Sequence, residues 1–334
     1  MFADARDLSV LVTGGAGFIG SHLCERLLTD GAKVTCLDNL SSGKLSYLSG
    51  IRRKKGFRII KGDVLDAKTV NRAVKGVDAV CHLAAKVGVK HYVEHPIEVI
   101  RTNVFGTYNL LEACRRKRLK RFVFASTSEV YGKNSDVPLS EESSRILGPS
   151  RIDRWCYSTS KSIDEHLCHS YRKEYDIPLV ILRYFNSYGP RQDSSDYGGV
   201  VPIFMRRILN NQAPQVHGDG NQTRSFTFIA DAIDATVTSL LRKEAVGEVL
   251  NIGNPVETSI MKLANSIIRV AGKEGELKPE LMPYNEFYGR SYEDLRRRVP
   301  DISRARRLLG FEPRVALKEG LHLTFQWYQK EFTA

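Results

Sequence analysis

Short apolar segments alternate with helical patterns along the first half of the chain, and this alternation constrains the fold more than any other feature. Segments typical of buried strands span residues 9–13, 33–38, 57–63, 77–83, 121–126 and 179–183. Helical patterns lie between them at about 18–30, 103–116 and 157–174. Because strands that alternate with helices form a parallel, doubly wound sheet, we predict an α/β fold.

The second half of the chain is less regular. Gly, Pro and polar residues are frequent at 188–199 and 218–221, which is typical of loops. We therefore expect a sheet domain over residues 1–185 and a smaller substrate-binding region over 186–334. Residues 249–253 look like one more strand, so we expect about 225–255 to return to the sheet domain and the two parts to interleave.

Composition excludes several classes of protein. The 334 residues are 42% hydrophobic and 26% charged, a globular balance with enough apolar material for a core. No apolar run approaches the ~20 residues of a transmembrane helix, and the first residues lack the apolar stretch of a secretion signal. The net charge of +12 suits an anionic metabolite. The basic runs 52–55 and 115–118 are more typical of solvated surfaces than of a nucleic-acid site.

Cysteine and histidine spacing argues against a metal site. The six cysteines are scattered, and no pair has the two-residue gap of a zinc or redox motif. We expect buried free thiols and a cytoplasmic location. His91 and His95 have helical spacing, but no third ligand accompanies them, so we predict no metal.

A glycine motif after the first strand predicts a dinucleotide site. Gly14, Gly17 and Gly20 lie between this strand and the first helical pattern. The first glycine permits the tight turn, the second lets the backbone approach a pyrophosphate, and the third allows close packing of helix on strand. Phe18 and Ile19 lie in the first helical turn, whose free N–H groups attract an anion. This context identifies the doubly wound sheet as a Rossmann fold.

The acidic residue after the second strand indicates which dinucleotide binds. Asp38 can accept hydrogen bonds from the ribose hydroxyls and would repel a 2′-phosphate, so we predict NAD rather than NADP. The alternative is a turn aspartate that caps residues 39–41. Asn39 belongs to the predicted cofactor site, and Asp63 with Val64 follows the third strand, where we expect the adenine.

Two further motifs predict redox chemistry on a hydroxyl group. Tyr157 and Lys161 are four residues apart, hence on one helix face. The ammonium is expected to lower the pKa of the phenol, so that a phenolate takes a proton from a sugar hydroxyl as its carbon gives hydride to NAD. Thr127 and Glu129 follow the fifth strand, where ligands of such sheets bind. The alternative for Glu129 is a surface carboxylate in a turn.

Together these motifs resemble the extended short-chain dehydrogenase/reductases that modify nucleotide sugars. Shared segments include 82–85, 183–186 and 188–191. The resemblance implies that Thr127 supports the C4 oxygen of the sugar, that Tyr157 is the base, and that Lys161 also binds the nicotinamide ribose. It implies further cofactor contacts from Leu83, Ala84, Ala85, Asn103 and Tyr184. It implies substrate contacts from Lys86, Asn186, Arg191, Val201, Arg224 and Tyr292.

The resemblance leaves the reaction open after oxidation at C4. A C6 carboxylate could leave as carbon dioxide, water could be eliminated, or the ketone could turn over and invert C4. Ser128 stands where 4,6-dehydratases usually have Asp. Segments 154–161 and 288–302 resemble UDP-glucuronate decarboxylases, in which Arg298 matches an arginine proposed to protonate the sugar. The alternative is that residues 296–298 form a solvated run.

We therefore favour decarboxylation of UDP-glucuronate, with Thr127, Ser128, Glu129, Tyr157, Lys161 and Arg298 as catalytic residues. A 4-epimerase acting on UDP-glucose or UDP-glucuronate is the alternative. A 4,6-dehydratase and a non-catalytic NAD-binding protein are less favoured. The family resemblance also implies a homodimer, in which the helices at 103–116 and 157–174 pair across a four-helix interface.

Overall fold

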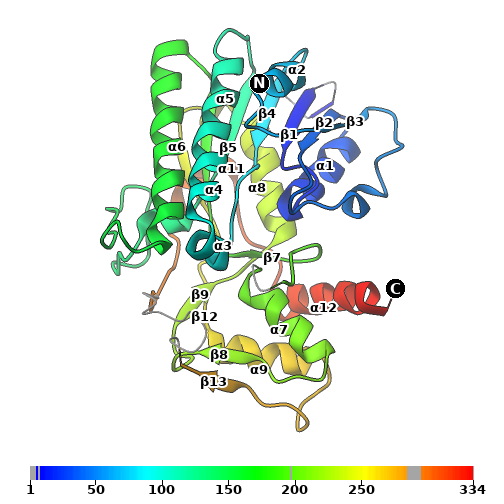
Figure 1. The fold of residues 1–334 in the computed structure, drawn as a ribbon, viewed down its shortest axis with the longest axis vertical. Helices are drawn as coiled ribbons and strands as arrows, with labels where there is room; N and C mark the ends of the chain where they lie inside the picture. Colours follow the sequence, from blue (N-terminus) through cyan, green and yellow to red (C-terminus); the bar gives the residue numbers. More distant parts are fainter. Residues whose placement is uncertain (1–4, 7, 196–197, 284–294, 334) are drawn as a thin grey trace.

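A parallel sheet lies at the centre of the larger part of the molecule (Figure 1). The computed structural model describes residues 5–6, 8–195, 198–283 and 295–333. Within these residues the sheet has seven strands in the order β3-β2-β1-β4-β5-β6-β11. The strands are β1 (Ser9–Thr13), β2 (Lys33–Asp38), β3 (Phe57–Lys61), β4 (Ala79–His82), β5 (Arg121–Thr127), β6 (Leu179–Tyr184) and β11 (Val249–Ile252). The predicted doubly wound α/β fold is confirmed.

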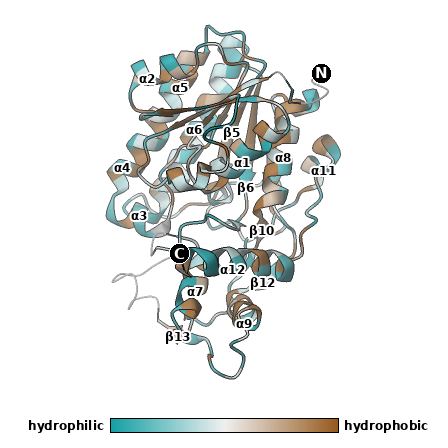
Figure 2. Cartoon of the chain, turned by 90° about the vertical axis from the view of Figure 1, so that its right-hand side faces the viewer, coloured by the Kyte–Doolittle hydropathy of each residue, from teal (hydrophilic) through white to brown (hydrophobic). Residues whose placement is uncertain are grey.

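Helices cover both faces of the sheet because its strands are apolar on both sides. In β1, Val10 and Val12 pack on one face and Leu11 on the other, as strand alternation requires. Figure 2 shows the brown strands between the two helix layers. One layer contains α1 (Phe18–Thr29), α8 (Ile229–Leu241) and α11 (Ser303–Leu309). The other contains α2 (Ala67–Ala73), α5 (Gly106–Cys114) and α6 (Arg154–Tyr175).

Short elements connect the helix layer of α5 and α6 to the carboxyl edge of the sheet. A helical stretch comprises α3 (Val89–Glu94), α4 (Pro96–Ile100) and the π-helical turn η2 (Arg101–Phe105), which continues into α5. Three 3₁₀ turns are η1 (Leu45–Leu48), η3 (Ser128–Tyr131) and η4 (Lys243–Ala245). η3 directly follows β5 and carries Glu129.

A smaller part lies below the sheet in Figure 1, at the end where β7 (Ser187–Tyr188) follows β6. Its paired strands are β7 with β10 (Thr227–Phe228), β8 (Gln215–His217) with β13 (Glu280–Met282), and β9 (Thr223–Ser225) with β12 (Glu257–Ser259). Its helices are α7 (Val200–Leu209), α9 (Ile260–Val270) and α12 (Leu317–Thr333). The chain passes repeatedly between the parts, because α8, β11 and α11 all pack in the sheet domain.

Element ends differ from the predictions by a few residues. The strands predicted at 57–63 and 77–83 are shorter in the structure, with β3 ending at Lys61 and β4 ending at His82. The helix predicted from residue 157 begins at Arg154, because Arg154 and Trp155 are buried and extend it. None of the described helices is long and apolar enough to cross a membrane.

Candidate active site

The glycine turn between β1 and α1 has room for glycine alone. Gly14 has a φ of +68°, and a Cβ there would lie 2.9 Å from the backbone nitrogen of Ala84. A Cβ on Gly20 would lie 2.1 Å from the carbonyl oxygen of Gly14. The helix begins after Gly17 with no side-chain cap, so its first N–H groups are left for an anion. The turn therefore fits the pyrophosphate of a dinucleotide.

Asp38 has the capping role that its position suggested and keeps room for the predicted contact with ribose. The carboxylate is 8% exposed at the end of β2. Its oxygens accept hydrogen bonds from the N–H of Leu40 at 2.8 Å and from that of Ala16 at 2.9 Å. The residue thus caps its own turn and also holds the glycine turn. Each carboxylate oxygen has a second lone pair, which leaves capacity for a ribose hydroxyl.

A cavity of about 550 Å³ opens at the predicted adenine end. Asn39, Asp63 and Lys86 line it, together with residues of α4 and η2. The amide of Asn39 donates to the carboxylate of Asp63 at 2.8 Å. The ammonium of Lys86 pairs with Glu98 at 3.0 Å. Val64 is buried beside Gly106.

Buried polar contacts hold the loop after β4. The hydroxyl of Thr13 lies 2.7 Å from Nδ1 of His82 and accepts hydrogen bonds from the N–H groups of Leu83 and Ala84. Burial lowers the pKa of His82 to about 3, so the ring is neutral. Asn103 accepts from the Lys86 N–H at 2.8 Å and donates to the Ser160 hydroxyl at 3.1 Å. The loop that includes Ala85 is thereby tied to α6.

The predicted reactive residues come together where β5 meets α6. Thr127 ends β5, Tyr157 lies in the first turn of α6, and Lys161 follows one turn later. Tyr157 is 7% exposed, and the Tyr92 ring stacks on it with centroids 4.9 Å apart. The Nζ of Lys161 lies 4.2 Å from the centre of the Phe124 ring.

The expected lowering of the Tyr157 pKa is wrong for the protein without ligands. Burial raises the pKa of this phenol well above its ordinary value, and the charge of Glu129 raises it further. A hydrogen bond with Thr127 and the charge of Arg298 oppose this effect but do not outweigh it. The tyrosine is therefore a neutral phenol until a bound group alters the local field.

Glu129 is a largely buried ion-pair partner, with 15% of its side chain exposed, rather than a surface carboxylate. Its Oε1 accepts a hydrogen bond from Nη1 of Arg298 at 2.6 Å, and its Oε2 lies 3.7 Å from Nη2 of Arg154. Burial raises the pKa of Glu129, but Arg298 and Arg154 lower it to about 2. The charge of Arg224 acts in the same direction. Ser128 beside it is buried.

Arg298 does not belong to a solvated run. Arg296 and Arg297 are exposed and pair with Asp219 and Glu257, each at 2.7 Å. Arg298 by contrast is 3% exposed. Its Nε and Nη2 have no hydrogen-bond partner among the described residues. Two donors thus remain for a ligand beside Glu129.

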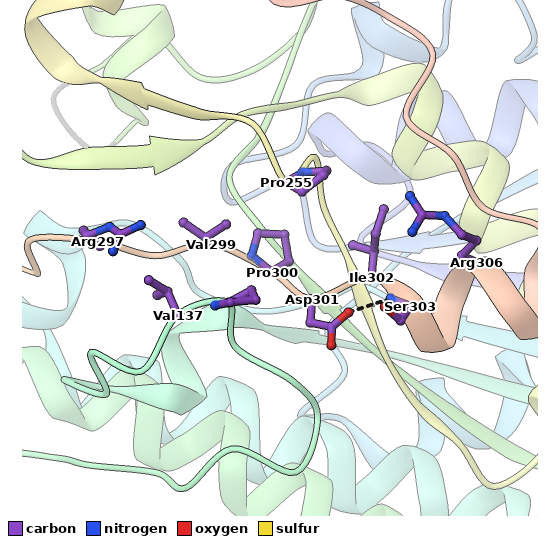
Figure 3. Close-up of a pocket in the computed structure, with 10 residues that line it drawn as sticks. Val137, Pro255, Arg297, Val299, Pro300, Asp301, Ile302, Ser303 and Arg306 are labelled. Atoms are coloured by element: carbon purple, nitrogen blue, oxygen red, sulfur yellow. Dashed lines mark hydrogen bonds between the residues drawn. The ribbon is translucent and has the colours of Figure 1, made fainter.

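Backbone hydrogen bonds hold Arg298 in this position. The segment of residues 298–301, called the strap below, pairs with Leu139. The Leu139 N–H donates to the carbonyl of Val299, and the Asp301 N–H donates to the carbonyl of Leu139, both at 2.8 Å. A second cavity, of about 340 Å³, lies on this strap (Figure 3). Proline rings and residues of the strap line it, and none of its lining residues is a predicted site residue.

The predicted substrate residues have varied surroundings. The amide of Asn186 donates to the Ser225 carbonyl at 3.0 Å, and Arg191 pairs with Glu25 of α1 at 2.8 Å. Arg224 donates to the Leu295 carbonyl at 2.7 Å. Of the remaining substrate residues, Val201 is buried in α7 and Tyr292 lies outside the described residues. Tyr184, which was predicted to contact the cofactor, has its hydroxyl 2.6 Å from that of Thr236.

Two residues of this site were not among the predicted ones. Arg154 belongs to a segment that the sequence singled out, but only its distance to Glu129 indicates a role. Tyr92 had no sequence signal, since nothing in its segment predicts a stack on Tyr157. Within the described part of the chain, no group of three His, Cys, Asp or Glu side chains is placed to hold a metal.

Comparison with known proteins places this site in a family. The family model described as GDP-mannose 4,6 dehydratase matches residues 11–324. The chain is 39% identical over 320 residues to the UDP-N-acetyl-alpha-D-glucosaminuronate decarboxylase of Bacillus cytotoxicus, covering 96% of this chain and 97% of that protein. It is 36% identical to UDP-glucuronic acid decarboxylase 1 of Xenopus tropicalis, covering 96% and 72%.

A solved structure of another nucleotide-sugar enzyme has the same fold. The UDP-glucuronic acid 4-epimerase of Bacillus cereus, in complex with UDP-glucuronic acid and NAD, superimposes with a TM-score of 0.87 at 32% identity. The match covers 97% of this chain and 100% of that one. The chain therefore belongs to the GDP-mannose 4,6-dehydratase family of nucleotide-sugar enzymes, within the extended short-chain dehydrogenase/reductases.

Proposed function

We propose that this protein is an NAD-dependent enzyme that decarboxylates UDP-glucuronate through a 4-keto intermediate. The observation that carries the proposal is the buried ion pair of Glu129 and Arg298 next to Thr127 and Tyr157. A carboxylate and a guanidinium with two unused donors suit a reaction in which a sugar carboxylate is lost and a carbon is then protonated.

The proposed chemistry begins at the C4 hydroxyl of the sugar. NAD, held by the glycine turn and Asp38, would supply the acceptor for the C4 hydride. Tyr157 takes the hydroxyl proton, and Thr127 donates a hydrogen bond to the oxygen that becomes the ketone. The C5–C6 bond of the resulting β-keto acid then breaks, carbon dioxide leaves, and the electron pair moves onto the C4 oxygen held by Thr127 and Tyr157. Arg298, or a water that it orients, delivers the proton to C5.

The charges near Glu129 explain why a uronate is the favoured substrate. Arg154, Arg224 and Arg298 all act on this one carboxylate, so the cluster attracts an anionic sugar. Glu129 keeps its negative charge at any ordinary pH and repels the substrate carboxylate. Loss of neutral carbon dioxide relieves that repulsion. The decarboxylases of Bacillus cytotoxicus and Xenopus tropicalis, to which the chain is similar, support this assignment.

A 4-epimerase is the second candidate, because the Bacillus cereus enzyme of similar structure is named a UDP-glucuronic acid 4-epimerase. Inversion at C4 needs mainly Thr127, Tyr157 and Lys161, all of which this chain has. The ion pair of Glu129 with Arg298 would then only bind the substrate carboxylate.

One assay separates the candidates. The purified protein is incubated with NAD and UDP-glucuronate, and the product is analysed by mass spectrometry and NMR. Loss of one carbon dioxide supports decarboxylation, whereas an unchanged mass with a new C4 configuration makes the protein a 4-epimerase. Arg298→Ala should abolish carbon dioxide release, and its exposed neighbour Arg297→Ala serves as the matched control.

We also propose a homodimer formed through α4, α5 and α6, which pack beside one another (Figure 1). This side of the molecule has large exposed apolar side chains, among them Ile97, which is 73% exposed. The others are Ile100, Phe105, Tyr108 and Ile163. Exposed apolar groups at this density are typical of an interface. The six free cysteines support a cytoplasmic location.

A further inference from the structure

Asp164 is a carboxylate in a position that is costly for the fold. The residue lies on α6 and is 0% exposed. Neither of its carboxylate oxygens has a partner at full hydrogen-bond geometry among the described residues, and only the Thr107 hydroxyl and the Lys161 ammonium lie close enough to act on it as weak donors. Burial of a carboxylate without hydrogen bonds is destabilising, so its presence here calls for an electrostatic explanation.

Lys161 is the charged group nearest to this carboxylate. Its Nζ lies 3.7 Å from Oδ2 of Asp164, one helical turn away, and both side chains are buried. The neighbouring Glu165 cannot fill the same role, because Arg183 binds it at 2.7 Å and Ser126 donates to it. Of the two carboxylates, Asp164 is therefore the one that is available to pair with Lys161.

Glu165 on α6 also acts on both groups through its charge, but Arg183 pairs with it. The Tyr157 phenol faces Asp164 from the first turn of α6. The remaining groups that face this pair are uncharged. They are the Thr107 hydroxyl on α5, the neutral His82 ring on β4, the Phe124 ring on β5 and the Cys168 thiol on α6. Burial lowers the pKa of Lys161, and Asp164 is the strongest influence that raises it. Without this carboxylate, the ammonium would be buried beside an aromatic ring, neutral polar groups and a Glu165 carboxylate that is already paired with Arg183.

We propose that Asp164 is a positioning residue that acts as the counter-ion of Lys161, keeping the buried ammonium charged and extending catalysis to alkaline pH. The inference rests on the proposed function, in which Lys161 acts beside Tyr157. Burial raises the pKa of Asp164 to about 7. Below that pH the carboxyl holds its proton and the wild type should resemble a neutral variant. Above it the two should diverge.

The test compares Asp164→Asn with Glu174→Gln, which removes an exposed carboxylate from the same helix. The pKa of Lys161 is measured in the protein without NAD by competitive acetylation at a series of pH values, with mass spectrometry of the peptide. Asp164→Asn should lower the half-point of Lys161 by about 1 unit or more, and Glu174→Gln should leave it unchanged. The alkaline limit of kcat/KM for the nucleotide-sugar reaction should move in parallel.

An unchanged half-point in Asp164→Asn would overturn the proposal. So would an equal loss of activity at every pH, which indicates a structural role. Since labelling needs neither substrate nor NAD, its result is independent of which sugar reaction is catalysed. Asp164→Ser is the second variant if the first does not fold. The wild type provides a further test, because a Lys161 half-point near 6, typical of buried lysines without a counter-ion, contradicts the proposal.

Discussion

Replacing Glu129 with Gln tests the buried ion pair through both stability and catalysis. The pKa of this carboxylate falls from an ordinary 4.5 to about 2, and one pKa unit corresponds to about 1.4 kcal/mol. The charged form thus stabilises the fold by about 3 kcal/mol relative to a neutral side chain. Because the pKa is lowered in the folded state, this stability is present above pH 4.5 and is lost as pH falls toward 2.

Glu129→Gln should therefore lower the free energy of unfolding by about 3 kcal/mol at pH 7, and the difference from wild type should shrink below pH 4.5. Urea denaturation at pH 7 and again below pH 4.5 measures the free energy of unfolding of both proteins. Glu142→Gln is the control, since its 2.7 Å pair with Arg304 involves a carboxylate that is 79% exposed. A loss below about 1 kcal/mol is expected there.

The same variant should separate substrate binding from catalysis. With Glu129 neutral, the arginine cluster is free to hold the substrate carboxylate, so UDP-glucuronate should bind more tightly. Carbon dioxide release should fall by about 10²-fold or more, because the repulsion that favours departure is gone. Calorimetry measures both affinities. The affinity for UDP-glucuronate should rise, whereas the affinity for NAD should be unaffected. Equal losses of NAD binding and decarboxylation would refute this reasoning, as would wild-type stability.

Three further outcomes are expected. Gly20→Ala places a Cβ 2.1 Å from a carbonyl oxygen of the turn, so calorimetry should show loss of NAD binding. The control is Gly50→Ala, in which the nearest atom to the new Cβ is 3.8 Å away, and this variant should bind NAD normally. Tyr157→Phe should abolish every conversion of UDP-sugars in the mass-spectrometric assay while keeping NAD affinity, and residual turnover would exclude this base. Ile163→Glu should convert a dimer to a monomer in light scattering, while Val256→Glu, an exposed position in the smaller part, should not.

Local physical chemistry explains why much of the fold was predictable. Strands buried on both faces are largely apolar, so most of the six predicted segments were visible without any knowledge of their neighbours. The edge strand β3, with Arg58 and Lys61 exposed, shows the pattern less clearly. The glycine turn was equally visible, since the positive φ at Gly14 and the contact at Gly20 involve residues close in sequence. Tyr157 and Lys161 share a helix face for the same reason: the helical repeat is a short-range property.

Helix ends and charge states were less predictable because they depend on distant contacts. α6 starts earlier than its pattern indicated, since Arg154 is buried against the site. The pKa of Tyr157 is raised rather than lowered, because desolvation outweighs the favourable charges around it. No sequence window contains the burial of a side chain, so the sign of such a shift requires the folded protein.

The sequence by itself determined the sheet, the dinucleotide turn and the tyrosine–lysine pair, all of which follow from steric and periodic rules over short stretches of chain. A family resemblance singled out Arg298, but nothing in the local sequence showed that its burial would differ from that of Arg296 and Arg297. Only the tertiary structure sends Arg296 and Arg297 to solvent and buries Arg298 against Glu129, 169 residues away. The physical reason is that burial of a guanidinium is costly unless a carboxylate pairs with it. The backbone hydrogen bonds of Leu139 with Val299 and Asp301 hold Arg298 where it reaches Glu129.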